Sequence, residues 1–166
     1  MERAASYWIE TLNLLPHPEG GFFREVYRSV ELMTDLPERY NGPRCFSTSI
    51  YFLLRGDQFS AFHRIQSDET WHFYCGCALE IFILGEKNAY QKIILGPPDS
   101  DTLVFQHTIS RGKWFAAKPI QTNSYSLLGC TVSPGFDFSD FEMGEYEKLS
   151  AIFFAQAELL KKYCIK

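Results

Sequence analysis

The segment from residue 56 to residue 76, GDQFSAFHRIQSDETWHFYCG, contains a histidine and a glutamate on either side of a short polar turn. His63 precedes the turn at residues 66–68, and Glu69 follows it. An imidazole is the side chain that most readily exchanges a proton near neutral pH, and a nearby carboxylate fixes its tautomer. The spacing predicts a catalytic pair in which Glu69 hydrogen-bonds a ring nitrogen of His63. A buried pair with a purely structural role is the alternative.

Both residues stand in segments that alternate as β-strands do, with successive side chains on opposite faces. The alternation gives two candidate inward faces, Ala61, His63 and Ile65 on the first strand and Glu69, Trp71 and Phe73 on the next. If both faces point into one interior, Trp71 and Phe73 form the walls of a pocket and contact its ligand. His72 has the opposite parity, but its place beside the pair makes it a further candidate ligand contact.

The same segment resembles the first sequence signature of the cupin superfamily, which runs Gly, His-x-His, Glu and then Gly. His63 stands at the first histidine, Glu69 at the glutamate and Gly76 at the final glycine, whereas Ile65 stands at the second histidine. In the second signature, Pro-x-Gly-x-x-His, Phe115 stands at the histidine. The resemblance implies that a metal centre of three histidines and one glutamate keeps only one residue of each kind here. Metals of the iron class need at least two histidines and a carboxylate, so we expect no bound metal and no other cofactor.

Three longer segments, HPEGGFFRE, FHRIQSDETWHFY and PGFDFSDFE, are similar to the hallmark segments of an uncharacterised cupin family. That family is akin to the RmlC-like deoxysugar epimerases. The resemblance runs over nearly the whole chain and implies a jelly-roll barrel, a homodimer and a small-molecule pocket. In RmlC-like epimerases a barrel histidine removes a proton next to a sugar carbonyl, and a tyrosine donates one. Here the candidate donors are Tyr27, Tyr51 and Tyr125.

Arg24 and Tyr27 lie in a β-type run, GFFREVYRS, which begins beside the glycine pair at residues 20–21. Neighbouring residues face opposite sides of a strand, so one of Arg24 and Glu25 points inward. An inward Arg24 offers a planar fork for a ligand carboxylate or phosphate, with Tyr27 as a second ligand contact. An ion pair at a dimer interface is the equally weighted alternative for Arg24. His17, just before the strand, is interpreted as a turn residue.

Short β-type runs fill the middle of the chain, with turn residues between them, for example at residues 55–57 and 110–112. Regular short strands with a turn every ten or so residues are typical of a sandwich or barrel. Apolar residues at helical spacing predict one helix within residues 4–15 and another within residues 145–164. The sequence thus predicts an all-β fold, a cupin jelly-roll β-barrel (double-stranded β-helix) with N- and C-terminal helices, as a single domain over residues 1–166.

Aromatic and acidic residues alternate in the segment SPGFDFSDFE, residues 133–142. The aromatic set is Phe136, Phe138 and Phe141, and the acidic set is Asp137, Asp140 and Glu142. This alternation indicates a lid packed over the mouth of the barrel. Paired carboxylates also serve glycosidases, but acids crowded into one loop are more typical of a solvated face or a structural cap. The polar stretch at residues 34–44 is predicted to be a surface loop.

Composition excludes several classes of partner. The chain has 166 residues, of which 46% are hydrophobic and 16% aromatic, and its formal net charge is −4. It has no basic stripe of the kind that nucleic-acid binding needs and no apolar run long enough to span a bilayer. The N-terminus lacks a signal-peptide layout and the five cysteines are odd in number, so we expect reduced thiols and a cytoplasmic protein. The expected partners are a small-molecule ligand and a second copy of the chain, paired through the N-terminal strand.

These observations favour a small-molecule-binding cupin, with metal-free isomerase- or epimerase-like chemistry on a sugar or keto-acid type ligand. Whether the chain is an enzyme stays open at this point. One alternative is a metal-dependent cupin oxygenase, and another is a non-catalytic ligand-binding or structural module.

Overall fold

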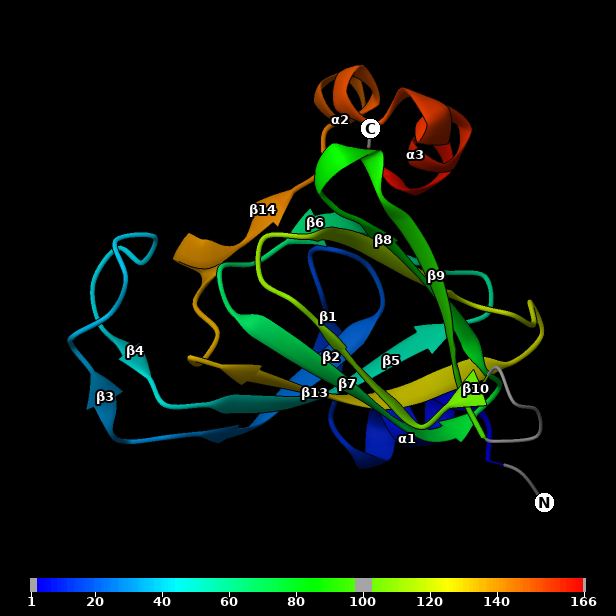
Figure 1. The fold of residues 1–166 in the computed structure, drawn as a ribbon. Coiled ribbons are helices and arrows are strands. Elements are labelled where there is room, and N and C mark those ends of the chain that lie inside the picture. The colour runs from blue at the N-terminus through cyan, green and yellow to red at the C-terminus, as the bar shows by residue number, and fades with distance from the viewer. Residues whose placement is uncertain (1–2, 98–102, 166) are drawn as a thin grey trace.

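The structure, a computed structural model, describes residues 3–97 and 103–165 and is built mainly from antiparallel strands (Figure 1). The strands are β1 (Leu15–Pro16), β2 (Phe22–Arg28), β3 (Leu32–Met33), β4 (Arg44–Cys45), β5 (Thr48–Arg55), β6 (Ser60–Arg64), β7 (Asp68–Gly76), β8 (Leu79–Leu84), β9 (Tyr90–Leu95), β10 (Leu103–Val104), β11 (Gln106–Ile109), β12 (Trp114–Pro119), β13 (Tyr125–Ser133) and β14 (Glu142–Met143). The helices are α1 (Ala5–Thr11), α2 (Tyr146–Ile152) and α3 (Ala157–Tyr163), with 3-10 turns η1 (Glu86–Asn88), η2 (Phe138–Asp140) and η3 (Phe154–Gln156).

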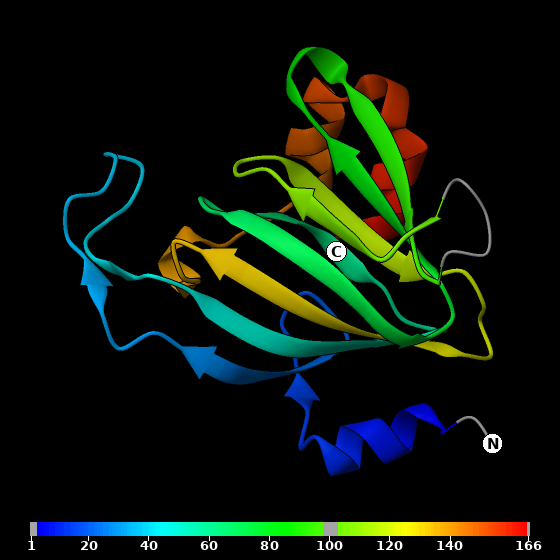
Figure 2. The ribbon, with the colours of Figure 1, turned by 60° about the horizontal axis from the view of Figure 1, so that its bottom comes forward.

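Two sheets of six strands face each other, as the two ribbon views show (Figure 1, Figure 2). The first sheet has the order β1-β2-β5-β13-β7-β11, and the second has the order β10-β9-β8-β12-β6-β14. The small hairpin β3-β4 stands apart from both sheets. The predicted all-β architecture, with helices towards both ends of the chain, is confirmed.

The core between the sheets is made by alternate residues of neighbouring strands. In register, Leu128 of β13 lies opposite Phe52 of β5 on one side and Phe73 of β7 on the other. The Trp71 ring lies 5.6 Å from the Phe52 ring and 6.0 Å from the ring of Phe115, which belongs to β12 in the second sheet. Trp71 therefore joins the two sheets, and burial of these large rings is the main force that holds them face to face.

Helix α1 covers the outer face of the first sheet, where Trp8 and Leu12 pack on Leu53 and Leu127. The Trp8 indole Nε1 donates a hydrogen bond of 2.8 Å to the Tyr125 hydroxyl. The helix begins at Ala5 with Ala4 as its N-cap, without a side-chain cap. This helix was expected from the sequence; its contacts place Tyr125 outside the barrel.

The predicted C-terminal helix consists of two short helices, α2 and α3, separated by η3. Leu149 of α2 and Leu160 of α3 pack against the outer face of the second sheet. Phe82 and Trp114 belong to the same buried cluster. The helix is interrupted at Phe153, whose φ of −109° and ψ of 56° are not helical. The break allows both short helices to lie on the same sheet face, as Figure 1 shows.

All five cysteines are free thiols. Within the described residues, no helix combines the length and apolarity that crossing a membrane requires.

Candidate functional site

A cavity of about 270 Å³ lies between the two sheets, near one end of the barrel. The inward-facing residues of β2, β5, β7 and β13 form one side of it, and β6 of the second sheet forms the other. Five phenylalanines contribute to its walls: Phe23, Phe52, Phe136, Phe138 and Phe141. The ionisable side chains in the lining are His17, Glu19, Glu25, Arg28, His63, Glu69, Cys130 and Asp137.

His63 sits in β6 with only 2% of its surface exposed, and both of its ring nitrogens have partners. Nδ1 lies 2.7 Å from the carbonyl oxygen of Ala61, and Nε2 lies 3.1 Å from Oε2 of Glu19. A carbonyl oxygen only accepts hydrogen bonds, so Nδ1 carries a hydrogen. The tautomer of the neutral ring is therefore fixed, with the lone pair on Nε2 facing Glu19.

Glu19 reaches His63 because the chain before β2 runs alongside β6. The Ala61 amide donates to the Glu19 carbonyl oxygen at 2.8 Å, and the Ser60 hydroxyl donates to Glu19 Oε1, also at 2.8 Å. Gly20 follows with a φ of +113°, and a Cβ at this position would lie 2.1 Å from the Phe59 carbonyl oxygen. Both the left-handed backbone and the close approach require glycine there. The glycine pair is thus what allows Glu19 to enter the cavity.

Glu19 and His63 share one proton. If the imidazole is neutral, Glu19 must supply the hydrogen between Oε2 and Nε2; if the imidazole is charged, Glu19 is a carboxylate. Burial raises the pKa of Glu19 and lowers the pKa of His63. Both shifts favour the neutral acid beside the neutral ring, because burial penalises charge.

His17 also lines this cavity, where its ring packs edge-on to Phe23 at 4.6 Å. Its Nδ1 accepts a hydrogen bond from the Glu19 amide at 3.3 Å, and burial lowers its pKa. The neutral ring therefore carries its hydrogen on Nε2. The turn-residue interpretation is right about the backbone, since Gly20 N donates to His17 O, but it omits the side chain's place in the cavity.

Glu69 is the second buried carboxyl group in the cavity, with 8% of its surface exposed. Its pKa is raised to about 7, mainly by burial; the facing His63 lowers it, Glu19 raises it, and Trp71 and Cys130 lower it. The Trp71 Nε1–H lies beside the carboxyl group without full hydrogen-bond geometry and has no other partner among the described residues. Burial and the Glu69 charge raise the pKa of the Cys130 thiol well above its ordinary value, so it stays protonated.

The structure brings His63 and Glu69 to one cavity, but not in the predicted hydrogen bond. The ring nitrogens of His63 are taken by Ala61 and Glu19, and Glu69 acts on the ring only through its charge. The sequence reasoning missed Glu19. The available signal was the glycine pair at residues 20–21 directly after Glu19, because glycine permits a left-handed backbone and the close approach of another strand.

Trp71 and Phe73 point inward, as their alternation predicts, but they do not line the cavity. Trp71 is 1% exposed and fills the core between Phe52 and Phe115. Phe73 packs on the same core, further along β7. They are core residues rather than pocket walls, because the loop at residues 134–141 and strands β2 and β5 supply the walls instead.

Arg24 and Tyr27 lie outside the cavity, which corrects both predicted ligand contacts. Arg24 is exposed, and its guanidinium donates to the Leu12 carbonyl oxygen at 3.1 Å. The pairing of β2 with β5 shifts register between Glu25 and Tyr27, which marks a β-bulge. A bulge reverses the alternation beyond it, so Tyr27 turns outward and Arg28 turns inward.

Glu25 and Arg28 are consequently the residues of β2 that reach the mouth of the cavity, beyond Phe23. Arg28 Nε and Nη2 donate to the two carboxylate oxygens of Glu25 at 3.0 and 2.7 Å. Arg28 Nη1 donates to the Phe136 carbonyl oxygen at 3.1 Å. The pair thus joins β2 to the loop that covers the cavity.

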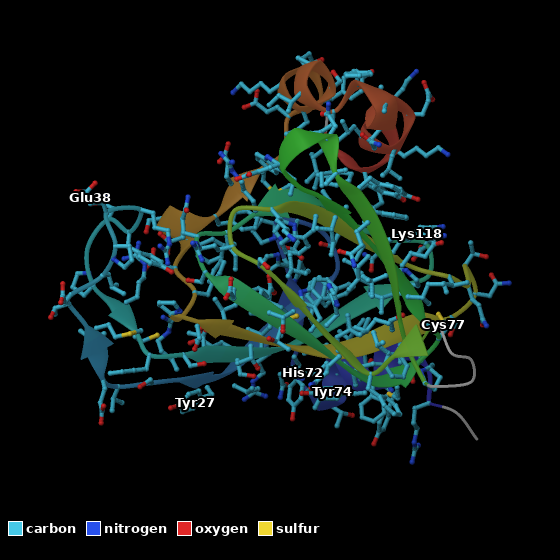
Figure 3. The ribbon with its side chains drawn as sticks, viewed as in Figure 1. Tyr27, Glu38, His72, Tyr74, Cys77 and Lys118 are labelled. Atoms are coloured by element: carbon cyan, nitrogen blue, oxygen red, sulfur yellow. The ribbon has the colours of Figure 1, made fainter. Side chains whose placement is uncertain are left out.

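His72 and the tyrosines proposed as acids also lie elsewhere. His72 is on the outer face of the first sheet, as its parity predicts, with Nε2 3.2 Å from the Thr131 hydroxyl (Figure 3). Tyr51 packs beneath α1 and lies 6.1 Å from the ring of Tyr74, while Tyr27 is 55% exposed. Neither His72 nor any of the three candidate tyrosines, which include Tyr125, lines the cavity.

The loop at residues 134–141, which we call the aromatic loop, closes the cavity with its three phenylalanines, as the lid interpretation expects. The acids of this region are held by other groups. Asp137 accepts from the Ser139 amide and hydroxyl, Asp140 binds Arg44, and Glu142 binds Arg64. This arrangement fits the structural cap rather than a glycosidase dyad.

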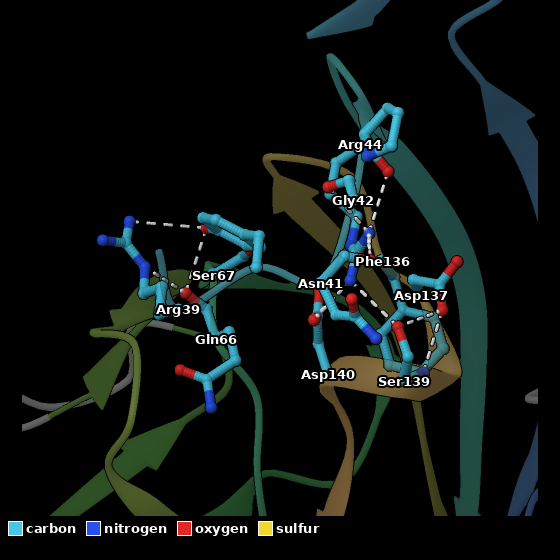
Figure 4. A network of polar contacts seen from close by, with 12 residues as sticks. Arg39, Asn41, Gly42, Arg44, Gln66, Ser67, Phe136, Asp137, Ser139 and Asp140 are labelled. Carbon is cyan, nitrogen blue, oxygen red and sulfur yellow. Dashed lines mark hydrogen bonds and ion pairs between the residues drawn. The ribbon is translucent and has the colours of Figure 1, made fainter. Parts of the chain in front are cut away.

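Figure 4 shows how the aromatic loop is anchored. Arg44 donates from Nε and Nη2 to the two oxygens of Asp140, at 2.7 Å each, and both side chains are buried. At the other end of the same segment, Arg39 Nε donates to the Gln66 carbonyl oxygen at 3.1 Å. We call residues 39–44 the clamp segment. It ties the aromatic loop to the turn between His63 and Glu69.

The donor set does not fit the metal centre that other cupins carry. The positions of the second and third histidines hold Ile65, which lines the cavity, and Phe115, whose ring lies 4.1 Å from the His63 ring. His63 Nε2 is already engaged by Glu19. Among the described residues, no group of three or more His, Cys, Asp or Glu side chains is arranged to hold a metal ion.

Comparison with known proteins identifies the family. Residues 6–144 match the family model described as Cupin_5: Cupin superfamily (DUF985). A hypothetical protein from Leishmania major has a similar structure, with a TM-score of 0.89 and 31% identity over 99% of this chain and 100% of that chain. A protein from Shewanella oneidensis is similar with a TM-score of 0.88 and 34% identity, over 99% of each chain. The curated proteins contain no match to this sequence.

The fold is also shared with more distant proteins. Oxalate decarboxylase from Bacillus subtilis is similar with a TM-score of 0.55 and 15% identity, over 89% of this chain and 36% of that chain. At this identity the likeness concerns the fold alone. The family match over residues 6–144, together with the two structures that are similar over their full length, agrees with the predicted resemblance: the chain belongs to the Cupin_5 (DUF985) family of the cupin superfamily.

Proposed function

We propose that this cupin binds a small carbonyl compound in the cavity and moves a proton within it, as isomerases and epimerases do. The observation that carries the proposal is the convergence of a proton-sharing pair, Glu19 and His63, and a separate titratable acid, Glu69, on one cavity between the two sheets. Acid–base catalysis works best when the pKa of the catalytic group lies near the working pH. The Glu69 pKa of about 7 meets that condition.

The step uses the two groups in complementary roles. The Glu69 carboxylate takes a proton from the carbon next to the carbonyl, and the C–H electron pair becomes the C=C bond of an enol. The shared proton of the Glu19–His63 pair passes to the carbonyl oxygen, whose C=O electron pair forms the new O–H bond. The proton on Glu69 then adds to the former carbonyl carbon, while the hydroxyl on the neighbouring carbon loses its proton to the Glu19–His63 pair and becomes the new carbonyl group. These transfers give the isomer and restore both groups.

Aromatic walls support this chemistry by excluding water. A closed, apolar surrounding strengthens electrostatic interactions and keeps an enol from losing its proton to solvent. The proposal routes both proton transfers through side chains and needs no metal. A chelator-treated sample is therefore expected to keep its full activity, whereas a metal-dependent oxygenase would lose it.

The test is exchange of substrate hydrogen for solvent deuterium, followed by proton NMR on a panel of small aldoses, ketoses and keto compounds in D₂O. We expect the wild-type protein to exchange the proton next to the carbonyl of at least one compound. Glu69→Gln and His63→Ala are expected to slow this exchange by about 10²-fold or more. Glu80→Gln and His72→Ala are matched controls outside the cavity and should exchange at the wild-type rate.

Two outcomes would overturn the proposal. One is wild-type exchange in the Glu69→Gln and His63→Ala variants. The other is tight retention of a panel compound by the wild-type protein with no exchange, which would instead support the non-catalytic binding module. Circular dichroism of each variant establishes that a loss of exchange is not a loss of fold.

A further inference from the structure

The cavity contains more acidic groups than basic ones in its lining. Its described lining contains four carboxyl groups and one guanidinium, and no lysine. That guanidinium, Arg28, is already bound through two hydrogen bonds to Glu25 at the mouth. No cation in the lining is therefore free to receive an anionic ligand.

At the inner end of the cavity, two buried carboxyl groups lie without a lysine or arginine beside them in the described lining. Glu19 and Glu69 are 6% and 8% exposed. Their polar neighbours are Ser60, the His17 and His63 rings and the Cys130 thiol, with the Trp71 indole beside Glu69. Buried carboxyl groups in proteins are normally paired with a positive partner or bound to a metal. Neither carboxyl group here has a lysine or arginine partner. An added carboxylate or phosphate would find no cation there, whereas an added ammonium group would favour the ionised form of either acid and be held by it.

The aromatic part of the lining suits the same kind of ligand. The rings of Phe136, Phe138 and Phe141 lie 5.0 to 6.2 Å apart and form one cluster in the lining. Aromatic faces attract organic cations, and more strongly when water is excluded. A volume of about 270 Å³ is small for a ligand site, since typical sites span roughly 300–1,000 Å³. The ligand is thus compact, and a nucleotide-linked sugar is too large to be enclosed.

We propose that the cavity binds a compact organic monocation, an amine on an apolar body, whose ammonium group lies against Glu19 and Glu69 and whose body lies against the aromatic loop. The proposal deepens the proposed function by naming a ligand class, and it rests only on the binding half of that function. It replaces the expected keto-acid by an amine-bearing compound.

Proton release follows from this placement. The groups that face Glu69 are Glu19, His63 and the Cys130 thiol, and none is a fixed cation. The Glu69 pKa of about 7 means that the group is partly protonated at neutral pH, and an ammonium beside it favours the carboxylate. Binding therefore releases a proton, and affinity for the amine rises from pH 6 to pH 8.

The experiment compares three probes of nearly the same size and shape but different charge: benzylamine, benzyl alcohol and benzoate. Isothermal titration calorimetry on the full chain at pH 7.5 gives each affinity. Titration in buffers of different ionisation enthalpy gives the number of protons released. We expect benzylamine to bind about tenfold tighter than benzyl alcohol, because a hydrogen bond to a charged group exceeds one to a neutral group. Benzoate should bind more weakly than both.

Glu69→Gln is expected to lower the affinity for benzylamine about tenfold and to abolish proton release, while leaving the affinity for benzyl alcohol unchanged. Glu80→Gln, a matched change on the outer side of β8, should leave all three affinities unchanged. Unaltered alcohol binding shows that a variant still has a folded cavity, so that a loss of amine affinity is specific.

Benzoate binding as tightly as benzylamine, or equal benzylamine affinity in Glu69→Gln and wild type, would overturn the amine proposal. So would Mn²⁺ that binds alone and displaces benzylamine, because a metal would then be the missing cation. Failure of this proposal is distinguishable from failure of the proposed function. Charge preference is read from binding, whereas proton transfer is read from deuterium exchange of a carbonyl compound.

Discussion

At the scale of single residues, the chemistry of the site depends on where three protons reside. Nδ1 of His63 must carry one because it faces a carbonyl oxygen, and the Glu19–His63 contact holds a second. The third proton belongs to Glu69. Because the pKa of Glu69 is about 7, this proton is the one most easily gained or lost near neutral pH. The His63 ring and Glu19 thus keep their protons near neutral pH, whereas the protonation of Glu69 changes with pH.

The raised pKa of Glu69 predicts how stability depends on pH. Its ordinary pKa is 4.5, so between pH 4.5 and 7 the folded protein holds this proton more tightly than the unfolded chain does. The stabilisation is fully present below pH 4.5 and is lost as the pH rises through 7, by about 3 kcal/mol in total. Glu69→Gln mimics the protonated form, so its free energy of unfolding should not show this loss.

The measurement is urea unfolding of wild type and Glu69→Gln from pH 4.5 to 8. The lowered pKa of His63 has the opposite effect on stability. As the pH falls below 6.5, the unfolded chain takes up a proton on this ring more readily than the folded protein does, so the folded protein loses stability. The difference between the two proteins therefore isolates Glu69 to a first approximation. Parallel pH profiles in both proteins would show that Glu69 titrates normally.

Sequence reasoning at this scale identified His63 and Glu69, two of the three groups proposed to act, and missed Glu19. Strand alternation was sufficient to place His63 and Glu69 on inward faces, because a period of two is set by backbone geometry. Glu19 could not be found in the same way, since it reaches the cavity from a glycine turn that lies beside β6, a strand about 40 residues later in sequence. A contact of that kind depends on tertiary packing and leaves no local period.

At the scale of elements, one extra residue in β2 decides which side chains reach the ligand. Because of the bulge between Glu25 and Tyr27, the side chain of Arg28 lines the cavity, whereas that of Tyr27, which was expected there, does not. A bulge has no strong sequence signal in a run without glycine, so regular alternation gave the wrong face. The strand itself and its neighbours were predictable from their β-branched and aromatic content.

The clamp segment, residues 39–44, holds the aromatic loop in place, so breaking its main contact should lower the stability of the protein. Arg44 and Asp140 form a buried ion pair with two hydrogen bonds of 2.7 Å. Arg44→Ala leaves Asp140 buried without its partner, so it should lower the free energy of unfolding by about 3–5 kcal/mol. Urea unfolding at pH 7.5 checks this expectation.

Lys148→Ala is the matched control, because Lys148 forms an exposed ion pair with Glu145. Exposed pairs contribute about 1 kcal/mol or less, so the control should unfold almost as the wild type does. A similar small effect for both variants would mean that the Arg44–Asp140 pair does not anchor the aromatic loop. The sequence predicted a polar surface loop here because its buried anchors, Tyr40 and Arg44, are few and surrounded by exposed residues.

At the scale of the whole molecule, the two-sheet architecture was predictable over nearly the full chain, because strand period, turn spacing and family resemblance agree. The pairing of the chain with a second copy stays a prediction. Strand β2 pairs with β1 only at Phe22 and Phe23, so residues 24–28 have no strand neighbour on that side among the described parts of the chain. An unpaired edge of this kind is a template for another strand.

We therefore expect a homodimer through β2, with twice the 19.2 kDa mass of one chain in light scattering at micromolar concentration. Tyr27→Lys places like charges near each other at such an interface, so it should shift the mass towards one chain. Val30→Lys, at a residue that is 95% exposed and outside β2, is the control and should remain a dimer. A wild-type monomer, or an unchanged dimer in Tyr27→Lys, would refute pairing through this edge.

The contact between Glu19 and His63 also spans the two halves of the barrel. Glu19 enters from the turn before β2, in the first sheet, whereas His63 belongs to β6, in the second. Burial between the two sheets is what lowers the pKa of His63, so this pKa is lowered only when the two sheets have come together. A titration of the His63 ring followed by nuclear magnetic resonance therefore reports whether the two sheets are packed together. It follows the assembly of the barrel without any added label.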